Sequence, residues 1–143
     1  MGVTNIPFND WSKKRLWNGT KTATSRTKKY GKTGDIFHVG FGDYEHMTFQ
    51  IDYIFKETLG NVVLDHYKEE GAETPQELID VWKTIHPRKG YRKEQMIFYH
   101  KFHRIAVVPS PCTVKDCDGT YRLGLDTWNS RVVCDVCGDW WDL

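Results

Sequence analysis

The sequence predicts an α+β fold with a mostly antiparallel, curled sheet, followed by a small second segment. Long strand-like stretches mix with a few short helical ones, without the regular strand–helix alternation of a parallel sheet. The clearest strand signal is the alternation of apolar and polar residues over 47–55. All four cysteines lie after Pro109-Ser110-Pro111, which we interpret as a linker. We therefore expect two units in the 143 residues, 1–108 and 109–143.

Two helices are expected in the first unit before residue 72. Asn9 or Asp10 can cap a short helix that runs to about Trp17, and Asn18-Gly19 is a typical helix end because glycine adopts left-handed conformations without steric strain. Residues 62–70 are predicted to form the second helix.

A third helix is signalled by the capping box Thr74-Pro75-Gln76-Glu77. Four apolar residues then follow at helical spacing: Leu78, Val81, Trp82 and Ile85. This spacing predicts a helix of about three turns that buries its apolar face.

Four stretches are predicted to be extended. Lys21–Arg26 is Thr-rich and alternating, Asp35–Val39 opens with β-branched and aromatic residues after a glycine turn, and Met47–Phe55 has period two. The stretch Met96–Val108 is long, aromatic and β-branched. Residues 40–43 are interpreted as a turn.

Charge is unevenly distributed, although the formal net charge is only +1. Residues 11–34 contain no acidic residue and are rich in basic ones, namely Lys13, Lys14, Arg15, Lys21, Arg26, Lys28, Lys29 and Lys32. Such a run indicates an anionic partner such as RNA, DNA or a nucleotide, although a solvated basic face is the alternative. Five of these residues are expected to contact a phosphate backbone: Lys13, Lys14, Arg15, Lys28 and Lys29.

Hydropathy argues against a membrane protein. The mean hydropathy is −0.60, and the longest aliphatic run, 105–108, is far too short to span a bilayer. The first ten residues also lack the apolar region of a signal peptide. We therefore expect a cytoplasmic protein.

The four cysteines have the spacing of a zinc site. Cys112 and Cys117 form one close pair and Cys134 and Cys137 another, separated by sixteen residues. Two such pairs can supply four thiolates to one tetrahedral ion, and in a segment this short the metal would supply much of the folding free energy. Disulfides or free thiols are the alternatives, and a cytoplasmic location disfavours disulfides. We expect structural Zn²⁺ here, because a closed four-thiolate site leaves no open position.

Two motifs in the first unit point to a known family. The pattern G-x-K-x-x-T-x-R spans Gly19–Arg26, and Gly34-Asp35 opens the next strand. Together with the segment 67–71, the helix 75–85 and the closing strand 95–102, they resemble the signature of ASCH domains. The resemblance covers about residues 5–107 and implies a PUA-like curled β-barrel with short helices and an RNA-linked function. The cysteine segment lies outside it and resembles an appended zinc ribbon.

The resemblance also implies site residues. Some ASCH-domain proteins are amidohydrolases that remove acyl groups from the exocyclic amine of cytidine, and others are described as RNA-binding or RNA-cleaving. In the amidohydrolase branch the site consists of the motif lysine, threonine and arginine and a later glutamate. These correspond here to Lys21, Thr24, Arg26 and Glu70.

Physical chemistry leaves these residues two interpretations. In an enzyme, a desolvated Lys21 would act as general base, Thr24 as nucleophile and Glu70 as proton donor to the leaving amine, with Arg26 holding a phosphate or oxyanion. In a binding protein, Lys21 and Arg26 would bind phosphate and Glu70 would neutralise Lys21. We place RNA or nucleotide binding first and acylcytidine hydrolysis second. A ribonuclease, or a protein partner bound through the ribbon, are further alternatives.

Overall fold

The computed structural model describes residues 2–40, 46–108, 110–112, 114–123 and 131–142. In these residues the strands form two antiparallel four-stranded sheets. The first has the order β1-β4-β3-β2, with β1 Ala23–Arg26, β2 Ile36–Gly40, β3 His46–Thr58 and β4 Met96–Val108. The predicted α+β fold with a curled antiparallel sheet is confirmed.

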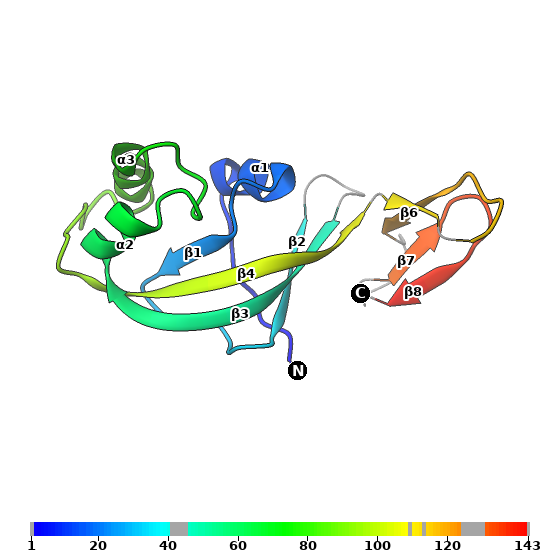
Figure 1. Cartoon of the computed structure of the whole chain (residues 1–143), viewed down its shortest axis with the longest axis horizontal. Coiled ribbons are helices and arrows are strands. Elements are labelled where there is room, and N and C mark those ends of the chain that lie inside the picture. The colour runs from blue at the N-terminus through cyan, green and yellow to red at the C-terminus, as the bar shows by residue number, and fades with distance from the viewer. Residues whose placement is uncertain (1, 41–45, 109, 113, 124–130, 143) are drawn as a thin grey trace.

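The curl of the first sheet follows its two long central strands, β3 and β4 (Figure 1). Their ladder has register shifts between Thr48 and Phe49 and between Ile51 and Tyr53. Such irregularities bend a strand and increase its twist, which lets a sheet of few strands wrap into a half-barrel. Of the turn predicted at residues 40–43, the structure describes only Gly40, which ends β2; the rest lies outside the described residues.

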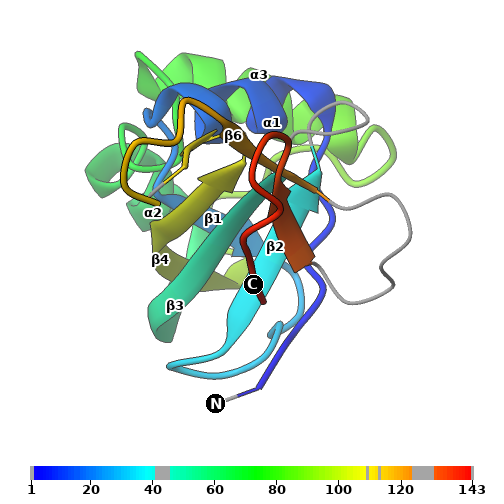
Figure 2. The same ribbon diagram turned by 90° about the vertical axis from the view of Figure 1, so that its right-hand side faces the viewer.

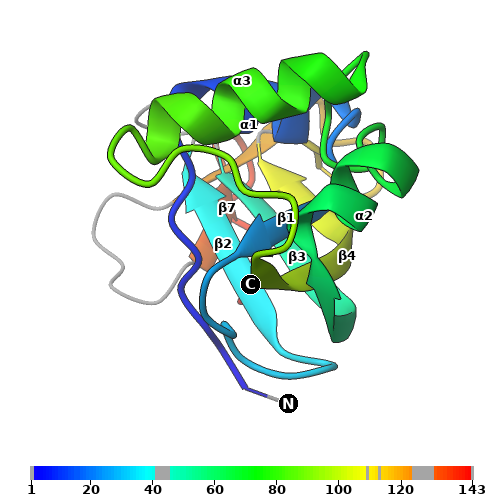
Figure 3. The same ribbon diagram turned by 90° about the vertical axis from the view of Figure 1, so that its left-hand side faces the viewer.

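Three helices lie along one side of this sheet: α1 Asp10–Asn18, α2 Leu59–Asp65 and α3 Pro75–Ile85 (Figures 1 and 3). The caps of α1 and α3 are those expected. Asn9 accepts a hydrogen bond from the Ser12 N–H at 2.9 Å, and Gly19 ends α1 with φ 85°. Thr74 caps α3 by accepting from the Glu77 N–H at 3.1 Å.

The helix predicted over 62–70 is wrong in its bounds. It begins at Leu59, where the Thr58 hydroxyl accepts from the Asn61 N–H at 3.3 Å, and it ends at Asp65. Leu59, Val62 and Val63 supply the buried face, so the helical pattern starts earlier than expected. Residues 66–71 instead form a bend and turns, and Gly71 has φ 98°.

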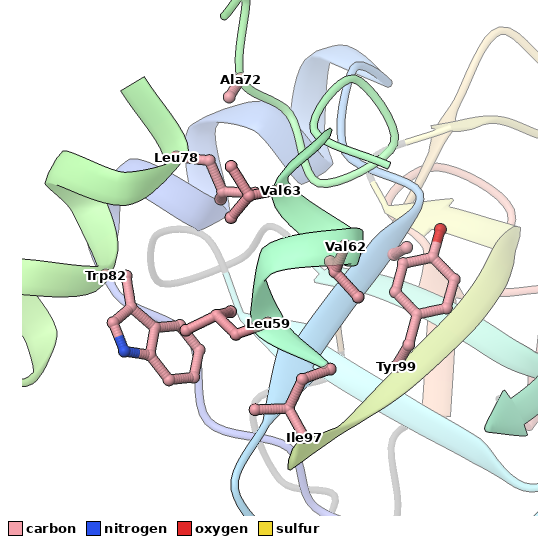
Figure 4. Packing of buried hydrophobic residues seen from close by; sticks show 9 residues of the cluster. Leu59, Val62, Val63, Ala72, Leu78, Trp82, Ile97 and Tyr99 are labelled. Atoms are coloured by element: carbon pink, nitrogen blue, oxygen red, sulfur yellow. The ribbon is translucent and has the colours of Figure 1, made fainter. Parts of the chain in front are cut away.

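Two hydrophobic clusters form the core of the first unit. One lies between α2, α3 and the strands β1 and β4, and includes Leu59, Leu78, Trp82 and Tyr99 (Figure 4). The other fills the curled sheet beneath α1: Ile6, Leu16, Phe37, Val39, Met47, Phe49, Ile51 and Phe102. The expected burial of the apolar face of α3 is only partly correct, because Ile85 is 46% exposed.

The second sheet follows the end of β4 at one end of the molecule (Figures 1 and 2). Its order is β5-β6-β7-β8, with β5 Ser110–Pro111, β6 Thr120–Leu123, β7 Arg131–Cys134 and β8 Trp140–Asp142. The interpretation of 109–111 as a linker is therefore wrong for Ser110 and Pro111, which pair with β6. The division at residue 108 stays a prediction. No helix in the described ranges is long and apolar enough to cross a membrane.

Candidate functional site

A pocket of about 380 Å³ opens between the start of α1, strand β1 and helix α3. The three motif residues Lys21, Thr24 and Arg26 line it together with Glu70, the later glutamate that the family resemblance implies. Ring-bearing and apolar side chains form the remaining walls, among them Phe8, Trp11, Tyr30, Val81, Trp82 and Ile85. Part of the apolar face of α3 thus lines the pocket rather than the core, which explains the exposure of Ile85.

The turn that follows α2 delivers Glu70 to this pocket. The Glu69 carbonyl accepts hydrogen bonds from the N–H groups of Thr22 and Ala23, at 2.6 and 3.0 Å. These bonds fix the turn against the beginning of β1. Gly71 allows the close approach, because its φ of 98° is one that other residues rarely adopt.

Inside the pocket, Lys21, Ser25 and Glu70 form a buried polar cluster. The Ser25 N–H donates to Glu70 Oε1 and the Ser25 hydroxyl to Oε2, each at 2.9 Å. Lys21 Nζ donates to the Glu70 carbonyl at 3.0 Å and lies 4.0 Å from its Oε1. Lys21 and Glu70 are each only 4% exposed. Sequence reasoning missed Ser25, whose one signal was its position between Thr24 and Arg26.

Burial lowers the pKa of Lys21 to about 8. The negative charge of Glu70 opposes this change, whereas the positive charges of Arg26 and Arg15 add to it. A buried lysine near neutral pKa exchanges protons readily at physiological pH, so it can serve as a general base as well as a cation. Perturbed groups of this kind in a pocket mark candidate functional sites.

Arg26 and Thr24 are positioned by other contacts. Arg26 Nη2 donates to the Pro7 carbonyl at 2.7 Å, its guanidinium lies 4.9 Å from the centre of the Phe8 ring, and burial lowers its pKa. The Thr24 carbonyl lies 3.3 Å from Nδ1 of the buried His100. His100 Nε2 accepts from the Tyr30 N–H at 3.0 Å, so Nδ1 carries the proton.

The other predicted phosphate-binding residues do not line this pocket. Arg15 is used within the fold: it donates to the Gly71 carbonyl at 3.1 Å and stacks 3.8 Å above the Trp11 ring. Lys14 and Arg15 line a separate pocket, together with Gly71. Exposed side chains are found at Lys14, Lys28 and Lys29, and Lys13 is half-buried.

The four cysteines of the second sheet come together as predicted. Their Sγ atoms all lie within 4.8 Å of one another, with Cys112–Cys137 at 3.7 Å and Cys117–Cys134 at 3.6 Å. The thiols are free rather than joined in disulfides. The cluster could hold a metal ion, and this arrangement fits a small zinc ribbon.

Backbone N–H groups point at these sulfur atoms. Val114 N–H lies 3.4 Å from Cys112 Sγ, Gly119 N–H 3.4 Å from Cys117 Sγ, and Val136 N–H 3.4 Å from Cys134 Sγ. Such donors stabilise the thiolate form that metal binding needs. Gly119 is required for another reason: a Cβ there would collide with Cys134 Sγ.

Comparison with known proteins supports the fold. The chain matches no family model and no curated protein. Among solved structures it is similar to the crystal structure of an ASCH domain from Lactobacillus crispatus, with a TM-score of 0.56 and 12% sequence identity. The match covers 72% of this chain and 78% of that chain. The curled sheet and its three helices therefore have the PUA-like ASCH fold, as the motif predicted.

Proposed function

We propose that the protein binds nucleotides, free or within RNA, and that the base and sugar of one nucleotide enter the pocket around Lys21. The observation that carries this proposal is the shared pocket: the three motif residues and Glu70 line one cavity with aromatic walls. Aromatic side chains stack on bases of any sequence, and a buried arginine supplies a charged donor for phosphate or carbonyl oxygens.

The size of the pocket supports one inserted nucleotide. Its volume of about 380 Å³ lies at the lower end of the range for small-molecule sites. Flanking nucleotides of an RNA would then lie outside it, where Lys28 and Lys29 are exposed on the loop after β1. Their role would be to neutralise phosphates without reading the base.

Titration with the four ribonucleoside monophosphates and a single-stranded RNA tests the proposal. For RNA, the logarithm of the affinity should fall with the logarithm of salt by about 0.7 per neutralised phosphate. The double variant Lys28→Gln/Lys29→Gln should reduce that slope, whereas Lys93→Gln, on an exposed lysine outside the pocket, should not. Absence of binding, or a salt-independent affinity for RNA, would contradict the proposal.

A second candidate function is hydrolysis of an acyl group from the exocyclic amine of cytidine. The specific observation in its favour is Lys21, whose pKa of about 8 suits a general base. In this mechanism neutral Lys21 takes the proton of Thr24, and the Thr24 oxygen attacks the acyl carbonyl. The Lys21 ammonium then passes this proton to the Glu70 carboxylate, which supplies it to the departing amine as the C–N bond breaks. Water then releases the acyl group from Thr24.

Turnover of N4-acetylcytidine by the wild type, Thr24→Ala, Thr24→Ser and Ser25→Ala decides between the two candidates. Release of cytidine by the wild type, lost in Thr24→Ala and partly kept in Thr24→Ser, would establish the hydrolase. No release by folded, metal-loaded protein leaves nucleotide binding as the function. Activity in Thr24→Ala but not in Ser25→Ala would move the nucleophile to Ser25. The ribonuclease alternative stays a prediction.

We further propose that the cysteine cluster holds structural Zn²⁺. Four thiolates bound tetrahedrally at about 2.3 Å lie roughly 3.8 Å apart, close to the sulfur separations of 3.6 and 3.7 Å found here. Zinc analysis should give one ion per chain, and a chelator should unfold the second sheet while the first persists. Substoichiometric zinc, with folding insensitive to chelator, would disprove it. Binding of a protein partner through this segment stays a prediction.

A further inference from the structure

Two buried N–H donors of the pocket have no hydrogen-bond partner. Among the described residues, three buried side-chain atoms lack a partner: Arg26 Nε, Trp82 Nε1 and Gln95 Oε1. The residues of the first two line the pocket, and that of the third does not. Buried donors are nearly always paired in native proteins, so each unpaired one requires an explanation. Two of them in one cavity indicate that a ligand supplies the missing acceptors.

Trp82 is held firmly, so its donor is not free to turn elsewhere. The side chain is 7% exposed and belongs to the core cluster with Leu59 and Leu78. The His86 ring packs on the indole with the ring centres 4.4 Å apart. In Figure 4 the six-membered ring lies toward Leu59 and the nitrogen on the opposite side. The apolar part of the indole is sufficient for this packing, so the core does not require the N–H group.

Arg26 reaches the same region from β1. Its Nη2 is fixed by the Pro7 carbonyl and its face by the Phe8 ring, so the guanidinium has one orientation. The pKa of His86 is lowered by burial and by the positive charges of Lys89 and Arg26. Arg26, Trp82 and His86 line the same pocket, so the two residues that carry an unpaired donor belong to one cavity.

We propose that Trp82 is a specificity-determining residue of this pocket, donating its indole N–H, alongside Arg26 Nε–H, to acceptor atoms on the ring of the ligand. This inference rests on the proposed nucleotide-binding function and narrows it. The ligand ring must present carbonyl oxygens or unprotonated nitrogens, and an apolar ring of the same size is rejected. Sites built to bond a polar group discriminate strongly against analogues that lack it, because their own donors stay unpaired.

The variant Trp82→Phe tests the N–H donor apart from the aromatic ring, because phenylalanine keeps an aromatic side chain in the pocket wall but has no N–H. The matched control is Trp17→Phe, because Trp17 is a partly buried tryptophan that packs against the second core cluster and does not line the pocket. Affinity for the four ribonucleoside monophosphates is measured for the three proteins, with the thermal shift that each nucleotide produces. We expect binding about tenfold weaker in Trp82→Phe and within about twofold of wild type in Trp17→Phe.

The need for an acceptor on the ring can also be tested by changing the ligand instead of the protein. This test uses wild-type protein, so it remains valid if the Trp82→Phe variant does not fold. Ribofuranosylbenzene keeps the ring and sugar of a pyrimidine nucleoside but has no acceptor on the ring. It should bind wild type at least about tenfold more weakly than cytidine and should not distinguish wild type from Trp82→Phe.

The outcomes are distinct. Nucleotide binding by wild type that is unchanged in Trp82→Phe, or equal binding of ribofuranosylbenzene and cytidine, overturns the role of Trp82 and leaves the proposed function standing. Absence of nucleotide binding by folded wild type overturns the proposed function, and this inference with it.

Discussion

Ser25 holds both carboxylate oxygens of Glu70, through its N–H to Oε1 and its hydroxyl to Oε2, each at 2.9 Å. The two residues are 45 positions apart, and both are buried. Glu70 lies on a turn, so no helix or strand ladder sets its direction. The contact with β1 does so, and it keeps Oε1 facing Lys21 at 4.0 Å.

Replacing Ser25 by alanine should destabilise the protein by about 1–3 kcal/mol, because one oxygen of a buried carboxylate loses its partner. Urea unfolding followed by circular dichroism measures the change. Ser25→Thr, which keeps a hydroxyl, is the control and should retain more of the stability. Equal stability of Ser25→Ala and wild type would show that Glu70 does not depend on this hydrogen bond.

The lowered pKa of Lys21 should make the stability of the protein depend on pH in an unusual way. Its pKa is about 8 in the folded protein, against 10.5 for the fully solvated lysine of an unfolded chain. Between these values the unfolded chain binds more protons, so the free energy of unfolding rises as pH increases from about 8 to 10.5. Below pH 8 the amine is protonated in both states, and folding is less favourable by about 3 kcal/mol than above pH 10.5, where the amine is neutral in both.

Other groups titrate over the same range, so the test compares two proteins. Lys21→Met/Glu70→Gln removes both buried charges and keeps similar side-chain volumes. The stability of wild type should rise relative to this double variant between about pH 8 and 10, as measured by urea unfolding. A constant difference across that range would mean that Lys21 titrates normally.

Gly71→Ala should disturb the site through the backbone. The residue has φ 98°, and an added Cβ would lie 3.0 Å from Arg15 Cδ and 3.2 Å from Lys21 Cβ. We expect a loss of about 1–3 kcal/mol in unfolding free energy and weaker binding of any pocket ligand. Gly40→Ala is the control, because nothing lies within 4 Å of a Cβ there. Equal effects of the two substitutions would refute the special role of Gly71.

Gly119→Ala should weaken metal binding, since the new methyl group would collide with Cys134 Sγ and crowd Val136. Overpacking of this kind typically costs about 1–3 kcal/mol, which corresponds to roughly 5- to 150-fold in metal affinity. Competition with a zinc chelator measures the affinity, again with Gly40→Ala as control. Unchanged affinity would indicate that the second sheet relaxes around the methyl group.

Local features of this chain could be predicted because neighbouring residues determine them. Asn9 and Thr74 cap their helices through their own side chains, and Gly19 ends α1 through its own φ. The alternation over 47–55 lies within β3, and the cysteine spacing brings the thiols of each pair close together. The motif and the wider family resemblance also named the four residues that meet in the pocket, although neither could give their contacts.

Tertiary structure decided what depends on distant partners. The predicted helix start at residue 62 was wrong because Thr58, the last residue of β3, caps a helix that begins directly at Leu59. Nothing in the sequence around Ser25 indicates its role. Its role depends on Glu70, which lies 45 residues away on a turn that packs on β1. All four residues of the predicted apolar face of α3 line the pocket, and two of them, Leu78 and Trp82, also belong to the core cluster. The sequence by itself determined which residues form the helices and strands and which belong to the motif. The packing of these elements decided which side chains are buried. Burial in turn lowers the pKa of Lys21 and leaves the indole N–H of Trp82 without a partner.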